Sequence, residues 1–289
     1  MIRGSIAAIV TPFEDDAPDK GRFFDLVEWH VESGTAAIVP CGSTGEAATL
    51  DCDEHVMVIS WAVEAARGRM KVVGGTGSNS TAEAIDLSKK AVDAGADAVL
   101  LVSPYYNKPS QEGLYRHHMA IADAVDCPQI LYNVPGRTSS NLLPETVARL
   151  SAHHRIIGIK EASGSVEQAL DVLGLCPNFL VYSGDDLINY PILAVGGAGS
   201  ISVTANVAPE KMARMHNLFF SGRAREALNL HMELRELSKA MFIETNPAPV
   251  KTALAMMGRI NEEFRLPLVP MAASNREKLA KVLHHYGLI

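Results

Sequence analysis

The chain has 289 residues, of which 47% are hydrophobic, and a formal net charge of −7. This length and hydrophobic content suffice for one large domain with a substantial core. The acidic balance argues against a nucleic-acid-binding surface, because phosphate contacts need clustered Lys and Arg. No apolar stretch approaches the roughly 20 residues of a membrane-spanning helix, so we predict no membrane segment.

The cysteines and the start of the chain indicate a cellular compartment. The four cysteines stand at positions 41, 52, 127 and 176, and none forms a CxxC pair. This spacing argues against a zinc ribbon or a thioredoxin-like site and favours a reducing cytosol. Residues 1–12 lack the basic region, apolar run and cleavage site of a signal peptide. We therefore expect a cytoplasmic protein.

Short apolar runs recur along the chain and alternate with longer amphipathic stretches. They are rich in Val, Ile, Leu and Ala and are typical of strands in a parallel sheet that is covered by helices. Eight such strands in series favour closure into an α/β (β/α)8 TIM barrel. The predicted strands are Ser5–Thr11, Ala36–Cys41, Val72–Thr76, Ala98–Ser103, Gln129–Val134, Ile156–Lys160, Leu180–Ser183 and Ser200–Thr204.

Helical patterns lie between the strands. Phe23–Ser33 ends before a glycine, Thr81–Ala94 begins with a Thr cap, and Pro144–Ala152 opens with Pro in its first turn. After the eighth strand only helical patterns remain, at Pro209–Ser238, Pro249–Met257 and Asn275–His285. We therefore predict a barrel domain over residues 1–224 and a C-terminal helical appendage over residues 225–289 that packs on the barrel.

Lys160 is the strongest candidate for chemistry, because active sites of such barrels lie at the C-terminal ends of the strands. It follows the buried run Ile156–Ile159. Burial disfavours the ammonium form and lowers the pKa of a Lys, and a neutral amine can attack a ketone to form an imine. The alternative is a Lys that extends from the strand end to solvent or pairs with Glu161.

Three weaker candidates lie at other strand ends. Gly42–Gly45 offers two hydroxyls and successive N–H groups that could hold a carboxylate, although an ordinary strand-to-helix turn uses the same residues. Tyr132 could carry protons, although a strand-end Tyr is more often a packing residue. Arg137 could bind a substrate carboxylate, although a surface Arg is the simpler interpretation.

Other chemistries lack support in the sequence. The glycine-rich runs Gly74–Gly77 and Gly196–Gly199 have neither the GxGxxG nor the GxxxxGK[ST] spacing of nucleotide-binding loops. The chain has no HExxH motif, and its paired histidines are neighbours that do not face each other on a helix, so we predict no metal. Lys251 is a rival imine-forming Lys, but it is predicted to lie on a C-terminal helix, away from the strand ends.

At these residues the chain resembles the dihydrodipicolinate synthases, of the N-acetylneuraminate lyase/dihydrodipicolinate synthase family of pyruvate-dependent class I aldolases. The family condenses pyruvate with L-aspartate 4-semialdehyde in the diaminopimelate route to lysine, without a metal or an organic cofactor. The matching segments are Gly4–Ile6, Val10–Pro12, Gly42–Leu50, Pro104–Gly113, Leu131–Thr138, Gly158–Ala162, Ser183–Asp186, Ile201–Asn206 and Asn246–Lys251.

The resemblance implies a role for each candidate. Lys160 would form the Schiff base with pyruvate, and Tyr132 would donate and accept protons. Thr44 would contact the pyruvate carboxylate, and Arg137 would receive the carboxylate of the semialdehyde. The resemblance also implies substrate contacts at two further positions, namely Gly184 and the backbone near Ile201.

The resemblance also implies an assembly. Tyr132 would be linked through the hydroxyl of Ser43 to Tyr106, which in the family reaches the active site of a neighbouring subunit. A homo-oligomer follows, typically a tetramer built as a dimer of dimers. The family usually has Thr at the position of Ser43. Serine keeps the hydroxyl, so the relay is expected to survive with looser positioning.

Feedback inhibition by lysine is a further expectation from the resemblance. Responsive members bind lysine at a dimer interface, and a carboxylate there can pair with the ammonium group of the ligand. Cys52 stands where such members usually carry His or Trp, which weakens the expectation. The matching positions are Ala48, His55, Asn79, Glu83 and Tyr105.

Two alternatives remain open beside the synthase. Serine at position 43 is also common in the sister N-acetylneuraminate lyases, which form the same imine but act on a sugar acid. The run Asn133–Thr138 favours the synthase, because the sister lyases usually lack an Arg at position 137. The second alternative is a barrel that binds an acidic metabolite without turnover.

Overall fold

The computed structural model describes residues 2–289, and in this part of the chain eight parallel strands close into a barrel. Around the barrel they pair in the order β1–β10–β9–β8–β7–β6–β5–β4. Every strand overlaps its predicted apolar run, so the predicted (β/α)8 barrel is confirmed. The strands are β1 (Gly4–Ala7), β4 (Ala37–Ile38), β5 (Lys71–Gly75), β6 (Ala98–Val102), β7 (Gln129–Asn133), β8 (Ile156–Glu161), β9 (Leu180–Ser183) and β10 (Gly199–Ser202).

Contacts along the chain group it into two compact units. The first unit combines Met1–Val72 with Ser202–Ile289, and the second is Val73–Ile201. The sequence-based division after residue 224 stays a prediction. Within residues 2–289 no helix has the length and apolar character needed to cross a membrane.

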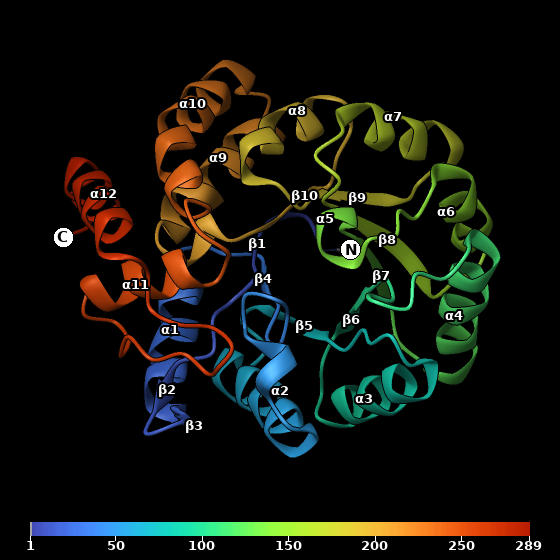
Figure 1. Ribbon diagram of the computed structural model, residues 1–289. Coiled ribbons are helices and arrows are strands. Elements are labelled where there is room, and N and C mark those ends of the chain that lie inside the picture. Colours follow the sequence, from blue (N-terminus) through green and yellow to red (C-terminus); the bar gives the residue numbers. More distant parts are fainter. Residues whose placement is uncertain (1) are drawn as a thin grey trace. The chain divides into compact units, whose positions relative to one another are not determined.

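The unit Val73–Ile201 alternates strands with helices that cover one face of the sheet. Its apolar core includes Leu150 and Val172 from two of these helices, packed with Leu131, Ile159 and Val181 from three strands. In Figure 1 helices of this unit form an arc outside strands β6–β9. The helices are α3 (Thr81–Asp93), α4 (Gln111–Ala124), α5 (Pro135–Thr138), α6 (Pro144–Ser151), α7 (Val166–Leu175) and α8 (Asn189–Ala194), with η2 (Asp186–Ile188).

Alternation along the strands of this unit separates the core from the candidate site. Leu131 of β7 pairs with Ile159 of β8, and both face the helices. Because successive strand residues point to opposite faces, the next pair in register, Tyr132 and Lys160, faces away from the helices. Tyr182 of β9 continues the same row. The apolar pattern therefore fixes the side of the sheet on which Lys160 lies.

The other unit contains the start and the end of the chain. It includes a two-stranded antiparallel pair, β2 (Phe13–Glu14) with β3 (Ala17–Pro18), which the apolar runs did not reveal because each strand has two residues. Asp15 and Asp16 form its turn with positive φ angles. The helices are α1 (Lys20–Glu32), η1 (Ala47–Thr49), α2 (Cys52–Ala66), η3 (Thr204–Asn206), α9 (Pro209–Phe220), α10 (Ala224–Ala240), α11 (Ala248–Met256) and α12 (Ala273–His285).

Two helix predictions are corrected by the structure. The pattern Pro209–Ser238 is not one helix, because the chain turns at Gly222 between α9 and α10. Gly222 has a φ of +82°, a conformation that is strained for residues with a side chain. The predicted Thr cap of α3 is also one residue too late. Ser80 is the N-cap, and its hydroxyl accepts a hydrogen bond from the backbone N–H of Glu83. The other predicted helices, including the C-terminal ones, are confirmed.

Candidate active site

Lys160 lies in β8 with its side chain buried, at 6% exposure. Its Nζ atom is 4.2 Å from the centre of the Tyr132 ring, and Tyr132 is itself 7% exposed. The two residues are register partners on adjacent strands, which explains the contact. Among the described residues no acidic side chain forms an ion pair with Lys160. The amine is therefore enclosed without a counter-charge.

Glu161 does not pair with Lys160, although the sequence left that alternative open. It is the next residue on the strand and points to the opposite face. Its carboxylate accepts hydrogen bonds from the side chains of Asn133 and Gln168 and from the backbone N–H of Ser163. The strand period of two could have excluded the pair from sequence alone.

Gly184 borders the Lys160 side chain. Its backbone N–H donates to the carbonyl of Glu161 at 2.7 Å. A Cβ atom at this position would lie 3.0 Å from Cε of Lys160 and 2.6 Å from Cβ of Ala162. Because glycine has no side chain, position 184 leaves space for the side chain of Lys160. Ile201, another predicted contact, is buried in β10 at 1% exposure.

Replacing Gly184 by alanine is expected to reduce activity by at least about tenfold, because the new methyl group must displace Ala162 or Lys160. Steady-state rates and thermal unfolding measure the effect. The matched control is Gly174→Ala on α7, where an added Cβ meets open space. Unchanged activity in Gly184→Ala would show that the space beside Lys160 has no catalytic importance.

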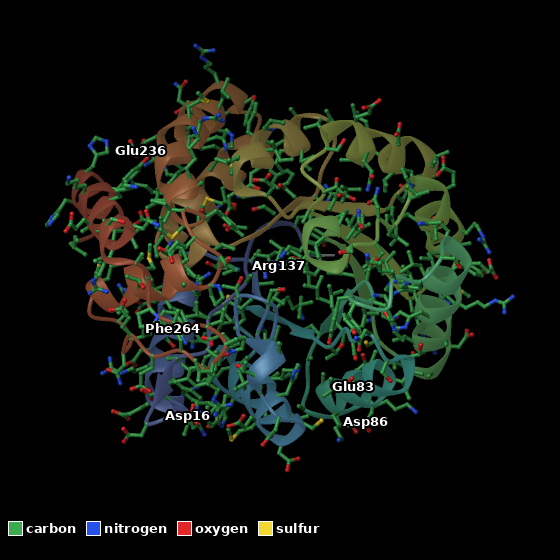
Figure 2. The ribbon with its side chains drawn as sticks, in the orientation of Figure 1. Asp16, Glu83, Asp86, Arg137, Glu236 and Phe264 are labelled. Carbon is green, nitrogen blue, oxygen red and sulfur yellow. The ribbon has the colours of Figure 1, made fainter. Side chains whose placement is uncertain are left out.

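Arg137 lies on the four-residue helix α5, directly after β7. Its side chain is exposed, and α5 lies inside the arc of α3, α4, α6 and α7 (Figures 1 and 2). Tyr106 lies in the segment after β6 with a positive φ of 71°, and 88% of it is exposed. A tyrosine so open to solvent packs against no core of its own unit.

Ser43 and Thr44 belong to the other unit, in the turn after β4. Gly45 donates its backbone N–H to Gly42 at 3.0 Å, which closes this turn. Thr44 is 3% exposed, and its hydroxyl accepts a hydrogen bond of 3.0 Å from the side-chain amide of Asn246. Ser43 is partly exposed. Asn246 was missed as a partner of Thr44, because 202 residues separate the two.

Lys251, the rival imine-forming Lys, is fully buried in α11 and paired with Glu46. Both side chains of this ion pair are 0% exposed. The Lys251 amine also lies 4.2 Å from the centre of the Phe13 ring. Burial lowers the pKa of Lys251, and the carboxylate of Glu46 opposes that shift. An amine held this way is a poor nucleophile, which supports the sequence-based preference for Lys160.

The residues of the predicted lysine site fall in both units. In Val73–Ile201, the side chain of Asn79 donates to the carbonyl of Tyr105 at 3.2 Å, and Glu83 accepts from the hydroxyl of Ser78. Figure 2 shows Glu83 on α3. In the other unit Ala48 is exposed in η1, and His55 is buried in α2. Lysine binding by these residues stays a prediction.

A model of the dihydrodipicolinate synthetase family matches residues 1–286 of the chain. The chain belongs to this family. The 4-hydroxy-tetrahydrodipicolinate synthase of Thermodesulfovibrio yellowstonii is 58% identical over 290 residues, and that of Geobacter sulfurreducens is 56% identical. Both alignments cover the whole of both chains.

Solved structures agree with the sequence relatives. The chloride-inhibited dihydrodipicolinate synthase of Acinetobacter baumannii, complexed with pyruvate, is 47% identical with a TM-score of 0.98, and the match covers both chains completely. The dihydrodipicolinate synthase of Aquifex aeolicus is 43% identical with a TM-score of 0.97 over 99% of this chain and 98% of its own. The resemblance inferred from the motifs is therefore confirmed as family membership.

Proposed function

We propose that the chain condenses pyruvate with L-aspartate 4-semialdehyde to 4-hydroxy-tetrahydrodipicolinate, the first committed step of lysine biosynthesis through diaminopimelate. Full-length relatives that carry this activity in their names support the proposal. The chain is thus a lyase. The observation that carries the chemistry is the enclosed amine of Lys160, which forms no ion pair within residues 2–289 and lies 4.2 Å from the Tyr132 ring centre.

The proposed reaction begins at that amine. In its neutral form it attacks the ketone carbon of pyruvate, and loss of water gives a protonated imine. The imine withdraws electrons, so the methyl carbon loses a proton and becomes an enamine. The enamine carbon attacks the aldehyde carbon of the semialdehyde. A new carbon–carbon bond forms, and the aldehyde oxygen takes up a proton. The amino group of the semialdehyde then attacks the imine carbon, which closes the ring and releases the amine of Lys160.

Tyr132 is the proposed proton carrier for these steps. Its place beside Lys160 supports the role, because a general acid or base must lie within reach of the group that it protonates. Ser43 is proposed to continue the proton relay. Thr44 is proposed to bind the pyruvate carboxylate, and the hydrogen bond from Asn246 supports this by fixing the orientation of its hydroxyl.

Arg137 is proposed to select the second substrate. A guanidinium can bind a carboxylate through two parallel hydrogen bonds, and an exposed Arg is open to an incoming aldehyde. A sister lyase that acts on a sugar acid does not need this group. The choice of substrate therefore depends on this one residue more than on the imine chemistry.

Replacing Arg137 by alanine is expected to lower kcat/KM for the semialdehyde by about a hundredfold, because two charge-assisted hydrogen bonds are lost. Imine formation with pyruvate is expected to change by less than about threefold. A coupled assay and borohydride trapping measure the two effects. Arg116→Ala removes an exposed Arg on α4 and is the control. Equal losses in both assays would contradict the proposed selectivity.

A homo-oligomer, typically a tetramer built as a dimer of dimers, is proposed with Tyr106 as a contact between subunits. Its 88% exposure supports the idea, because an aromatic side chain that is open to solvent in the single chain can be reached by a neighbouring subunit. Free cysteines at positions 41, 52, 127 and 176 support the proposed cytoplasmic setting.

A further inference from the structure

Four polar side chains join the ends of β7 and β8 to helix α7. Asn133 ends β7, Glu161 ends β8, Asn141 follows α5, and Gln168 lies in α7. All of them belong to the unit Val73–Ile201. Asn133 and Glu161 are register partners on the helix-facing side of the sheet, opposite to Lys160. We call these four side chains the amide network.

Glu161 is the centre of the amide network. It is 2% exposed, and its donors are uncharged. Gln168 donates to its carboxylate at 2.9 Å, Asn133 at 3.0 Å, and the backbone N–H of Ser163 at 2.7 Å. Burying a carboxyl group is costly unless its oxygens are satisfied. The donors come from three different elements, so satisfying Glu161 fixes these elements relative to one another.

The amides extend the network to the segment that carries Arg137. Asn133 donates to Oδ1 of Asn141 at 2.8 Å and accepts from the backbone N–H of Leu142 at 2.9 Å. Asn141 and Gln168 exchange two hydrogen bonds, of 2.8 and 3.1 Å. Residues 134–141 are therefore fastened at both ends to the same group of side chains.

The fastened segment is itself stiff. The hydroxyl of Thr138 donates to the carbonyl of Ser140 at 2.8 Å and accepts from its backbone N–H at 3.3 Å. The hydroxyl of Ser140 donates to the carbonyl of Pro104 at 3.2 Å. We expect residues 134–141, held by these hydrogen bonds, to behave as a rigid unit. The position of Arg137 on α5 therefore follows the position of the amide network.

We propose that the amide network positions Arg137 and thereby determines recognition of the second substrate, while leaving imine formation unaffected. The proposal rests on the role given above to Arg137. Gln168 is the informative member, because it lies outside the segment and in a different element from Lys160. Without its amide, Glu161 and Asn141 each lose a partner, and the segment loses its fixed place.

The test measures KM for the semialdehyde, KM for pyruvate and the rate of borohydride trapping with pyruvate in the full-length enzyme. Gln168→Ala and the size-matched Gln168→Met are compared with Asp171→Ala, an exposed residue of the same helix. Both Gln168 variants are expected to raise KM for the semialdehyde by about ten- to a hundredfold. The other two quantities are expected to stay within about twofold of wild type.

A double-mutant cycle decides whether Gln168 acts through Arg137. In the Arg137→Ala background, Gln168→Ala is expected to add less than about a twofold further loss, since the group that it positions is gone. The inference would be overturned if Gln168→Ala caused the same fold loss in the Arg137→Ala background as in wild type. It would also be overturned if Gln168→Ala raised KM for pyruvate as much as KM for the semialdehyde. If Arg137→Ala alone impairs semialdehyde use and Gln168→Ala does not, only the inference fails. If Arg137→Ala leaves semialdehyde use unchanged, the proposed role of Arg137 fails with it.

Discussion

The Lys160→Arg variant is expected to lose at least about a thousandfold of synthase activity. Arginine keeps the length and positive charge of the side chain, but its guanidinium stays protonated and cannot attack a ketone. Lys160 is buried beside Tyr132, and an arginine at this position cannot supply the nucleophilic amine. A coupled assay of semialdehyde consumption at saturating pyruvate measures the loss.

Two controls separate this loss from unfolding. Circular dichroism and thermal unfolding of Lys160→Arg are expected to match those of wild type, since arginine is similar in length to lysine. Lys211→Arg makes the same exchange at an exposed residue that pairs with Glu233, and it should keep full activity. A Lys160→Arg enzyme that retains even a tenth of wild-type activity would mean that this amine is not the nucleophile.

The Lys251→Met variant is expected to lose about 3–5 kcal/mol of unfolding free energy, because it leaves Glu46 buried without its partner. Glu46 also accepts a backbone hydrogen bond from Arg265, at 3.3 Å. It therefore cannot turn toward solvent without breaking a second contact. Denaturant unfolding at fixed protein concentration measures the change, because an oligomer's apparent stability depends on concentration.

A second substitution, at Glu46, tests whether the unpaired carboxylate causes the loss of stability in Lys251→Met. In the double variant Glu46→Gln with Lys251→Met, no uncompensated charge remains, and the Gln oxygen can still accept from Arg265. This double variant is expected to recover most of the lost stability. If it is as unstable as the single variant, lost packing around Phe13 rather than the unpaired buried charge of Glu46 explains the effect.

The local pattern of the chain sufficed to predict the barrel. Buried parallel strands are apolar on both faces, so each appears as a continuous run in the sequence. The predicted run Leu180–Ser183 matches β9 at both ends. The run Ala36–Cys41 is longer than β4, because ladder pairing is confined to Ala37–Ile38 while residues 39–41 after it remain buried.

The long-range contacts could not be predicted in the same way. Glu46 and Lys251 are 205 residues apart, and their pairing was not predicted, since no periodicity connects a strand-end turn to a C-terminal helix. Lys160 was singled out as a candidate from its strand position, because active sites of such barrels lie at the C-terminal ends of the strands. The amide network was missed, because a single sequence does not distinguish buried, hydrogen-bonded Asn and Gln side chains from solvent-exposed ones.

The most direct test of the central claim is to trap the imine. The enzyme is incubated with pyruvate and borohydride, digested, and mapped by mass spectrometry. We predict one reduced pyruvyl adduct, on the peptide that contains Lys160, with the Lys251 peptide unmodified. An adduct on any other lysine, or the absence of an adduct in an enzyme that still turns over, would contradict the account.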